Sequence, residues 1–130
     1  MLKYILIFIA SGFGGVLRYG LGGWVQNWWG PTFPLGTLVV NVSGCLGIGF
    51  FATAFSGTVL IREEYRIAVL VGIFGGYTTF SSFGRETMAL LHDGEWLRAG
   101  WYVLFTNAVG LFAVWLGAAA ATKLYGPGAP

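Results

Sequence analysis

Four long apolar segments, separated by short polar connections, constrain the fold of this chain more than any other feature. They span residues 2–24, 35–55, 66–91 and 96–124, and a helix that crosses a bilayer needs about 20 mostly apolar residues. Charged residues make up 9% of the chain, whereas a soluble domain usually has about 25%. The sequence therefore predicts an all-α integral membrane protein with four transmembrane helices. We expect a single domain over residues 1–125 and a flexible C-terminal tail over residues 126–130.

The third segment contains the place at which a helix is expected to break. Gly75 and Gly76 weaken a helix, and hydroxyl side chains follow at once. An interrupted backbone in lipid must be satisfied by protein, water or an ion. If the helix opens, the carbonyls of Gly75 and Thr78 lose their amide partners and can coordinate a hard cation such as Na⁺. The alternative is an intact helix whose hydroxyl groups bond to carbonyls one turn earlier.

Polar and aromatic side chains inside the segments are the candidate ligands of a permeating ion. The amide of Asn41 offers two donors to an anion, or alternatively bonds to a neighbouring helix. Phe80 and Phe83 lie three residues apart on one helix face, where positive ring edges can line an anion path; simple packing is the alternative. Tyr102 and Thr106 share a face of the last segment in the same way.

Two charged residues inside the segments narrow the functional class. Arg18 either extends to the membrane interface or draws anions toward a pore mouth. Glu86 is the one acid within a predicted span, and the first span has none, although a proton-coupled exporter normally needs a buried carboxylate. The chain has no HExxH, GxSxG or P-loop motif, so we do not expect an enzyme. A net charge of +2 without a basic run does not indicate a nucleic-acid partner.

The positive charges are almost evenly divided between the two predicted membrane faces. Orientation follows the asymmetry of Lys and Arg in short loops, and that asymmetry is weak here. One interpretation is that the chain inserts in both orientations and forms an antiparallel dimer; the other is that a single charge or the insertion machinery decides. The two sets are Lys3, Arg62, Arg66 and Lys123 on one face, and Arg18, Arg85 and Arg98 on or nearer the other.

Three motifs on successive spans resemble those of the Fluc fluoride channels, also called CrcB proteins. They are GGVLRY at residues 14–19, GTLVVNVSG at residues 36–44 and GGYTTFSSF at residues 75–83. The resemblance covers nearly the whole chain. It implies an antiparallel, dual-topology homodimer in the cytoplasmic (inner) membrane, which exports F⁻ passively and protects the cell from its toxicity.

The resemblance also implies roles for individual residues. It assigns a structural Na⁺ at the dimer centre to the main-chain oxygens of Gly75 and Thr78, and places Arg18 near an aqueous vestibule. The implied ion path comprises Asn41, Phe80, Ser81, Ser82, Phe83, Tyr102 and Thr106.

Two residues depart from the family pattern, and a second class of transporter shares the general architecture. Tyr77 stands where an aliphatic residue is expected, and Asn107 adds an amide to the fourth span. A small multidrug-type exporter also has four spans and dual topology, but the first span lacks the glutamate that such an exporter would use.

Overall fold

The described part of the chain, residues 1–57 and 59–126 of a computed structural model, has helices as its only regular secondary structure. Four of the helical spans are long and apolar enough to cross a membrane, which confirms the predicted fold class. The third span is built from four consecutive pieces. The elements are α1 (Leu2–Trp29), α2 (Leu35–Ser56), α3 (Glu63–Ile67), the π-helical segment η1 (Ala68–Ile73), α4 (Phe74–Tyr77), α5 (Phe80–His92) and α6 (Trp96–Tyr125).

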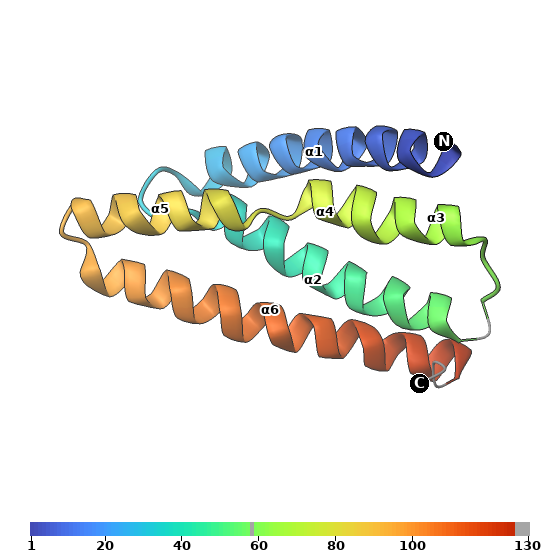
Figure 1. Ribbon diagram of the computed structural model, residues 1–130. Coiled ribbons are helices and arrows are strands. Elements are labelled where there is room, and N and C mark those ends of the chain that lie inside the picture. The colour runs from blue at the N-terminus through green and yellow to red at the C-terminus, as the bar shows by residue number, and fades with distance from the viewer. Residues whose placement is uncertain (58, 127–130) are drawn as a thin grey trace.

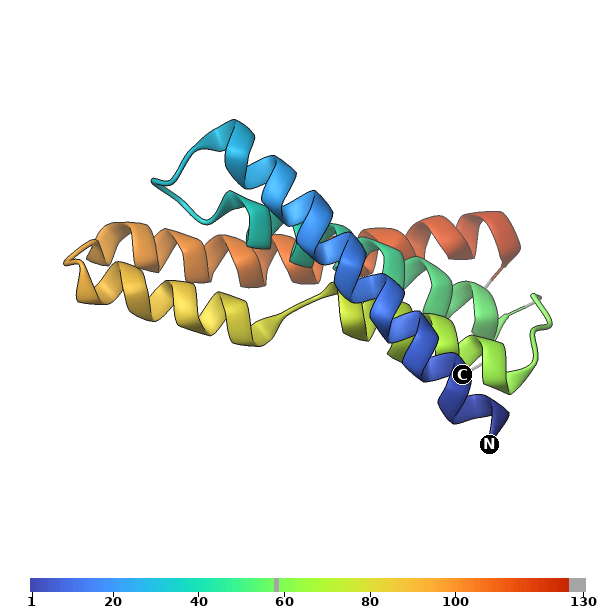
Figure 2. The same cartoon turned by 90° about the horizontal axis from the view of Figure 1, so that it is seen from above.

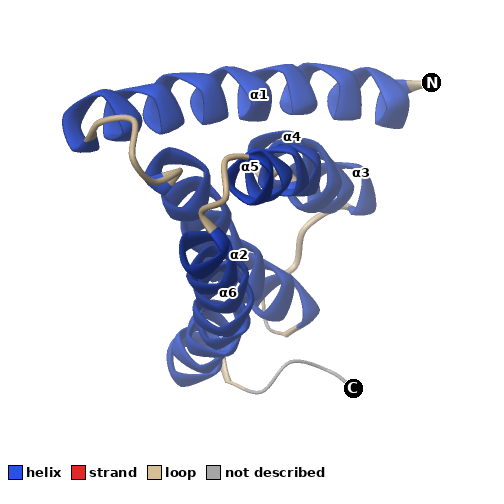
Figure 3. Cartoon of the chain, turned by 90° about the vertical axis from the view of Figure 1, so that its left-hand side faces the viewer, coloured by secondary structure: helices blue, strands red, loops and turns tan. Residues whose placement is uncertain are grey.

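The spans form layers, with α1 at one side of the molecule and α6 at the other (Figure 1). The third span and α2 lie between them, and α1 crosses the other helices obliquely when the molecule is seen from above (Figure 2). The end-on view shows α2 beside α6, and α5, α4 and α3 under α1 (Figure 3). The most extensive packing in the described chain joins α2 to α6, followed by α1 to the first half of the third span.

Glycines allow these helices to approach each other backbone to backbone. A Cβ atom added to Gly14 would collide with the Ile73 carbonyl, and one added to Gly76 would collide with the Ser11 carbonyl. The α2–α6 pair makes the same kind of contact, since a Cβ on Gly117 would meet the Leu46 carbonyl. Small residues at such crossings are typical of helices that associate in membranes.

The predicted break in the third span is present, but it begins at Thr78, two residues after Gly76, rather than at the glycines. Gly75 and Gly76 are helical and belong to α4. Thr78 and Thr79 are extended instead, with φ and ψ of −80° and 157° for Thr78 and of −150° and 111° for Thr79. Gly76 packs against α1, whereas Gly75 is exposed and has no neighbour within 4 Å of an added Cβ. The backbone leaves the helix only at Thr78.

The helices are also longer than predicted at several ends. The first span continues to Trp29 rather than stopping at Trp24, and the third begins at Glu63 rather than at Arg66. Helical geometry continues beyond the apolar core of a span as long as polar or interfacial residues can face the membrane surface. The predicted tail, apart from Gly126, lies outside the described residues.

Large apolar side chains cover much of the molecular surface. Phe8, Tyr19 and Phe80 are all more than 80% exposed, and similar residues occur on all four spans. A soluble monomer rarely exposes continuous apolar patches of this kind. Lipid or a second protein chain must therefore cover this surface.

Candidate functional site

The site is centred on the two extended residues, Thr78 and Thr79. The backbone N–H and the hydroxyl of Thr78 both donate to the Phe74 carbonyl at 2.9 Å, which closes the end of α4. In a continuing helix the Thr79 N–H would donate to Gly75, but it donates to Oδ1 of Asn41 at 2.8 Å. The break therefore redirects the amide that would otherwise satisfy the Gly75 carbonyl.

The Asn41 side chain of α2 bonds to both backbone groups of Thr79, the N–H and the carbonyl. Its Oδ1 accepts from the Thr79 N–H, and its Nδ2 donates to the Thr79 carbonyl at 3.1 Å. The structure thus contains the interhelical bond that was one of the two interpretations of Asn41. Because a carboxamide nitrogen carries two hydrogens, this bond leaves a second hydrogen that is not required by Thr79.

Arg18 reaches the break from α1. Its Nη1 donates to the Thr78 carbonyl at 3.3 Å, and the contact is partly buried. This places a positive charge at the C-terminal end of the half-helix that finishes at Tyr77, where the helix dipole favours cations. The guanidinium is therefore directed at the protein interior rather than simply at the membrane interface.

A cavity of about 330 Å³, here called the break cavity, lies beside this region. It collects residues from α2, both halves of the third span and α6, and six of them are predicted site residues: Asn41, Gly75, Thr78, Phe80, Phe83 and Thr106. The Thr106 hydroxyl is buried and has no hydrogen-bond partner within the described chain. Asn107 also lines the cavity, and its Nδ2 donates to the Val103 carbonyl of its own helix at 2.8 Å.

Phe80 and Phe83 line this cavity and form a continuous series of ring contacts with Tyr102 behind them. The rings of Phe80 and Phe83 lie 5.4 Å apart, and those of Phe83 and Tyr102 lie 5.2 Å apart, as measured between centroids. Phe83 and Tyr102 are buried, whereas Phe80 is 81% exposed. The predicted shared face of Phe80 and Phe83 is confirmed, and the Phe80 end of the series is exposed in a single chain.

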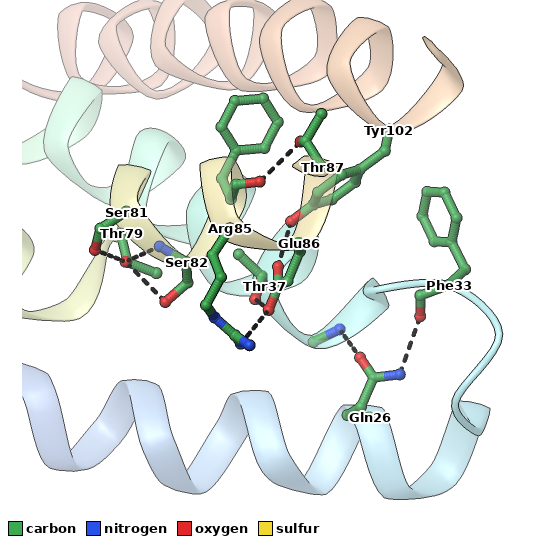
Figure 4. Close-up of polar contacts among 12 residues, drawn as sticks. Gln26, Phe33, Thr37, Thr79, Ser81, Ser82, Arg85, Glu86, Thr87 and Tyr102 are labelled. Carbon is green, nitrogen blue, oxygen red and sulfur yellow. Dashed lines mark hydrogen bonds and ion pairs between the residues drawn. The ribbon is translucent and has the colours of Figure 1, made fainter. Parts of the chain in front are cut away.

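The first turn of α5 carries the predicted hydroxyl groups. Thr79 caps the helix, since its Oγ1 accepts from the Ser82 N–H at 3.1 Å. The same oxygen lies 3.2 Å from the Ser81 hydroxyl and 3.1 Å from the Ser82 hydroxyl (Figure 4). Helix N-termini favour anions, so the start of α5 is an electrically favourable place for one.

A second and wider cavity, of about 1140 Å³, lies between α1, α2 and α5 and is here called the arginine cavity. Arg18, Ser82, Arg85 and Glu86 contribute to its lining. The two arginines give this space positive charge that one carboxylate only partly balances. Ser81 and Tyr102 are the predicted site residues that line neither cavity.

Glu86 has a structural role that sequence reasoning missed. One carboxylate oxygen accepts from the Thr37 hydroxyl at 2.9 Å, and the other accepts from the Tyr102 hydroxyl at 2.7 Å (Figure 4). The Arg85 guanidinium lies 3.8 Å away. Glu86 thereby joins α5 to α2 and α6, which explains how the one acid within a predicted span is accommodated. Its presence in an apolar segment was the available indication.

The fold and this site define the class of the protein as an integral, multi-pass membrane protein whose third span is interrupted beside a polar cavity. The family model described as CrcB-like protein, Camphor Resistance (CrcB), matches residues 5–118, and the chain belongs to this family.

Curated relatives agree with the family match. The chain is 49% identical to the fluoride-specific ion channel FluC of Paramagnetospirillum magneticum, over 94% of this chain and 97% of the relative. It is 48% identical to the FluC of Opitutus terrae, over 95% of this chain and 96% of the relative. A FluC from a Roseiflexus species is 39% identical over 95% of this chain and 99% of the relative. These relatives are named as channels, in agreement with the prediction that the chain is not an enzyme.

Proposed function

We propose that this protein is a fluoride-selective channel through which F⁻ leaves the cell passively across the cytoplasmic membrane, and that it thereby limits fluoride toxicity. The observation that carries the proposal is the break cavity, in which the Asn41 amide and the Thr106 hydroxyl meet two phenylalanine rings at the N-terminus of α5. The relatives named as fluoride-specific channels support the choice of ion. The multidrug-type exporter has no corresponding support.

The chemistry of the lining suits a small, strongly hydrated anion. A selective path must replace the water around the ion with groups from the protein. In the break cavity, Thr106 can supply a hydroxyl donor, the second hydrogen of the Asn41 amide can supply another, and ring edges of Phe80 and Phe83 add weak positive potential. Ser82 on the arginine cavity and Ser81 beside it can supply further hydroxyl donors along the path. None of these groups is a full positive charge in the narrow part of the path, so the ion is not trapped there.

The path is incomplete in one chain, which supports a dimer. Phe80 is 81% exposed, and Gly75 and Asn107 are also on the open side of the break cavity. A second copy seated against this face would enclose the lining, and the nearly even charge distribution favours an antiparallel arrangement. Two such paths would then lie along the contact between the subunits, with Arg18 at the mouth of each and Tyr102 supporting the inner aromatic ring.

The carbonyl oxygens at the break are suited to hold a structural Na⁺. Hard cations such as Na⁺ take oxygen ligands, and carbonyls at broken helices can coordinate them. The Gly75 carbonyl has lost the Thr79 amide to Asn41, and the Thr78 carbonyl lies in the extended segment, bonded to Arg18. We infer that Gly75 and Thr78 from each of two chains would hold the ion, which would fix the two breaks against each other.

Ion efflux from liposomes tests the proposed activity. Vesicles loaded with F⁻ or with Cl⁻ and containing the purified protein are diluted into ion-poor buffer, with a K⁺ ionophore to balance charge. We expect rapid F⁻ release, far slower Cl⁻ release and no release from protein-free vesicles. Absence of F⁻ release, or equal release of both anions, would overturn the proposal.

The aromatic path has a separate test. Phe80→Ile and Phe83→Ile retain apolar volume but remove the ring edges, so we expect each to slow F⁻ release by about tenfold or more, which corresponds to about 1.4 kcal/mol. Phe8→Ile, on the exposed surface of α1, is the control and should leave the rate unchanged. Wild-type rates in both path variants would remove the phenylalanines from the path.

Dual insertion is tested by labelling from one side of the membrane. Leu60 is 98% exposed in the connection between α2 and α3, so a Leu60→Cys variant in a Cys45→Ala background carries one accessible thiol. An impermeant thiol reagent added to intact cells should label about half of the protein if both orientations occur. Complete labelling, or none, would show a single orientation and exclude the antiparallel dimer.

A further inference from the structure

The contact between Arg18 and Thr78 has a consequence for the cation that the break would hold. The Arg18 guanidinium donates to the Thr78 carbonyl, which is one of the two main-chain oxygens proposed as Na⁺ ligands. We propose that Arg18 and Na⁺ compete for the end of the broken helix, so that Arg18 is a built-in cation that stabilises the break when Na⁺ is scarce. This inference rests on the proposed Na⁺ site and adds a residue that regulates it.

The position of Arg18 is enforced by the helix crossing. Gly14, one turn before Arg18, packs so closely on the third span that an added Cβ would lie 2.8 Å from the Tyr77 nitrogen and would collide with the Ile73 carbonyl. This close approach brings the Arg18 side chain to the end of α4. The α1 crossing therefore fixes the backbone position from which Arg18 reaches Thr78, while the side chain itself can still turn toward the arginine cavity.

Electrostatics give the direction of the effect. A carbonyl oxygen has two lone pairs and can accept from two partners, but two positive charges at one oxygen repel each other strongly in a medium of low dielectric constant. The guanidinium lies at the border of the arginine cavity, into which it can move when Na⁺ binds. Coupling between two binding events is reciprocal. Part of the free energy by which the Arg18 contact stabilises the break must therefore be lost when Na⁺ binds, and this weakens the apparent affinity for Na⁺.

A Na⁺ titration of thermal stability tests this competition. The full-length protein in detergent, at constant ionic strength maintained with a large organic cation, is melted at increasing Na⁺ while tryptophan fluorescence is followed. Arg18→Gln removes the charge, and we expect its melting temperature to fall in Na⁺-free buffer but to approach the wild-type value at saturating Na⁺. The Na⁺ concentration that gives half of the effect should decrease by about fivefold or more.

Two control variants separate charge from packing. Arg18→Lys retains the charge and should keep the half-effect concentration within about twofold of wild type. Arg98→Gln removes a charge in the first turn of α6, where Arg98 pairs with Glu95 at 3.2 Å, and should leave the Na⁺ response unchanged. If Arg18→Gln lowers stability equally at all Na⁺ concentrations, or raises the half-effect concentration, Arg18 is a packing residue and the competition is wrong.

A measurement on the wild-type protein keeps the test valid if Arg18→Gln does not fold. Phenylglyoxal modifies free guanidinium groups, and mass spectrometry gives the extent of modification at each arginine. Competition predicts that saturating Na⁺ speeds the modification of Arg18 by about fivefold and leaves that of Arg98 unchanged. An unchanged or slower rate at Arg18 would overturn the inference. A wild-type protein whose stability ignores Na⁺ would overturn the Na⁺ site itself, and the competition with it.

Discussion

The two halves of the third span are held in place by different kinds of contact. Before the break, η1 and α4 lie so close to α1 that backbone touches backbone at Gly14 and Gly76. After the break, α5 is held chiefly by polar side chains: Asn41 bonds to Thr79, and Glu86 bonds to α2 and α6.

This difference predicts which residues are needed for folding and which can be substituted to change ion conduction. Steric contacts at a helix crossing allow almost no change in side-chain volume. Hydrogen bonds at a cavity can be altered singly, each at a modest cost in stability. We therefore expect substitutions before the break to affect folding first, and substitutions after the break to affect ion conduction first.

The largest expected effect is at Gly76. In Gly76→Ala the new methyl group would collide with the Ser11 carbonyl, and because that atom is backbone, α1 itself would have to move. We expect a loss of about 3 kcal/mol or more in the free energy of unfolding, seen as loss of monodisperse protein in size-exclusion chromatography. Gly84→Ala, in α5, is the matched control, since nothing lies within 4 Å of its added Cβ. Equal yields of the two variants would show that the crossing is not tightly packed.

The next effect is at Glu86. In Glu86→Ala the fully buried Tyr102 and the partly buried Thr37 lose their acceptor, and we expect a loss of about 1–3 kcal/mol in stability. Adding Tyr102→Phe to this variant should restore part of the loss, because an apolar pair costs less than one unpaired hydroxyl. Thermal melting measures both, and F⁻ efflux should fall in the single variant because Tyr102 packs on Phe83.

The control for Glu86 is Glu95→Ala, which removes a carboxylate whose partner Arg98 is about half exposed. An exposed ion pair contributes about 0–1 kcal/mol, so this variant should remain close to wild type. A Glu86→Ala protein as stable as Glu95→Ala would show that the bonds between α5 and its neighbours contribute little.

The same contrast explains how much of the molecule could be predicted from the sequence. The four spans follow from hydropathy, because a bilayer requires each crossing to be long and apolar. The shared face of Phe80 and Phe83 follows from helical spacing alone. Both depend only on residues that are near one another in the chain.

Features that depend on distant residues were placed less accurately. The break was expected at Gly75 and Gly76, but its position is fixed by Asn41, which lies 38 residues before Thr79. Glu86 was identified as an unusual acid, but its partner Thr37 is 49 residues away. A single sequence indicates that such polar groups need partners, and only the packing of the spans determines which partners they have.

The smallest expected effect tests a polar contact on the steric side of the break. Tyr77, which stands where an aliphatic residue is expected, has its hydroxyl 2.7 Å from the Ser43 hydroxyl of α2. If the first half of the span is positioned by packing, this bond should contribute little to stability. Hydrogen bonds between membrane helices average about 0.6 kcal/mol in double-mutant cycles. We therefore expect a coupling energy of about 0.6 kcal/mol from thermal melting of the Ser43→Ala and Tyr77→Phe cycle, and we expect F⁻ efflux to be unchanged. A coupling above about 1.7 kcal/mol, the upper end for such bonds, or a slower efflux in Tyr77→Phe, would mean that the Tyr77 hydroxyl helps to hold the break, and that polar contacts position both halves of the span.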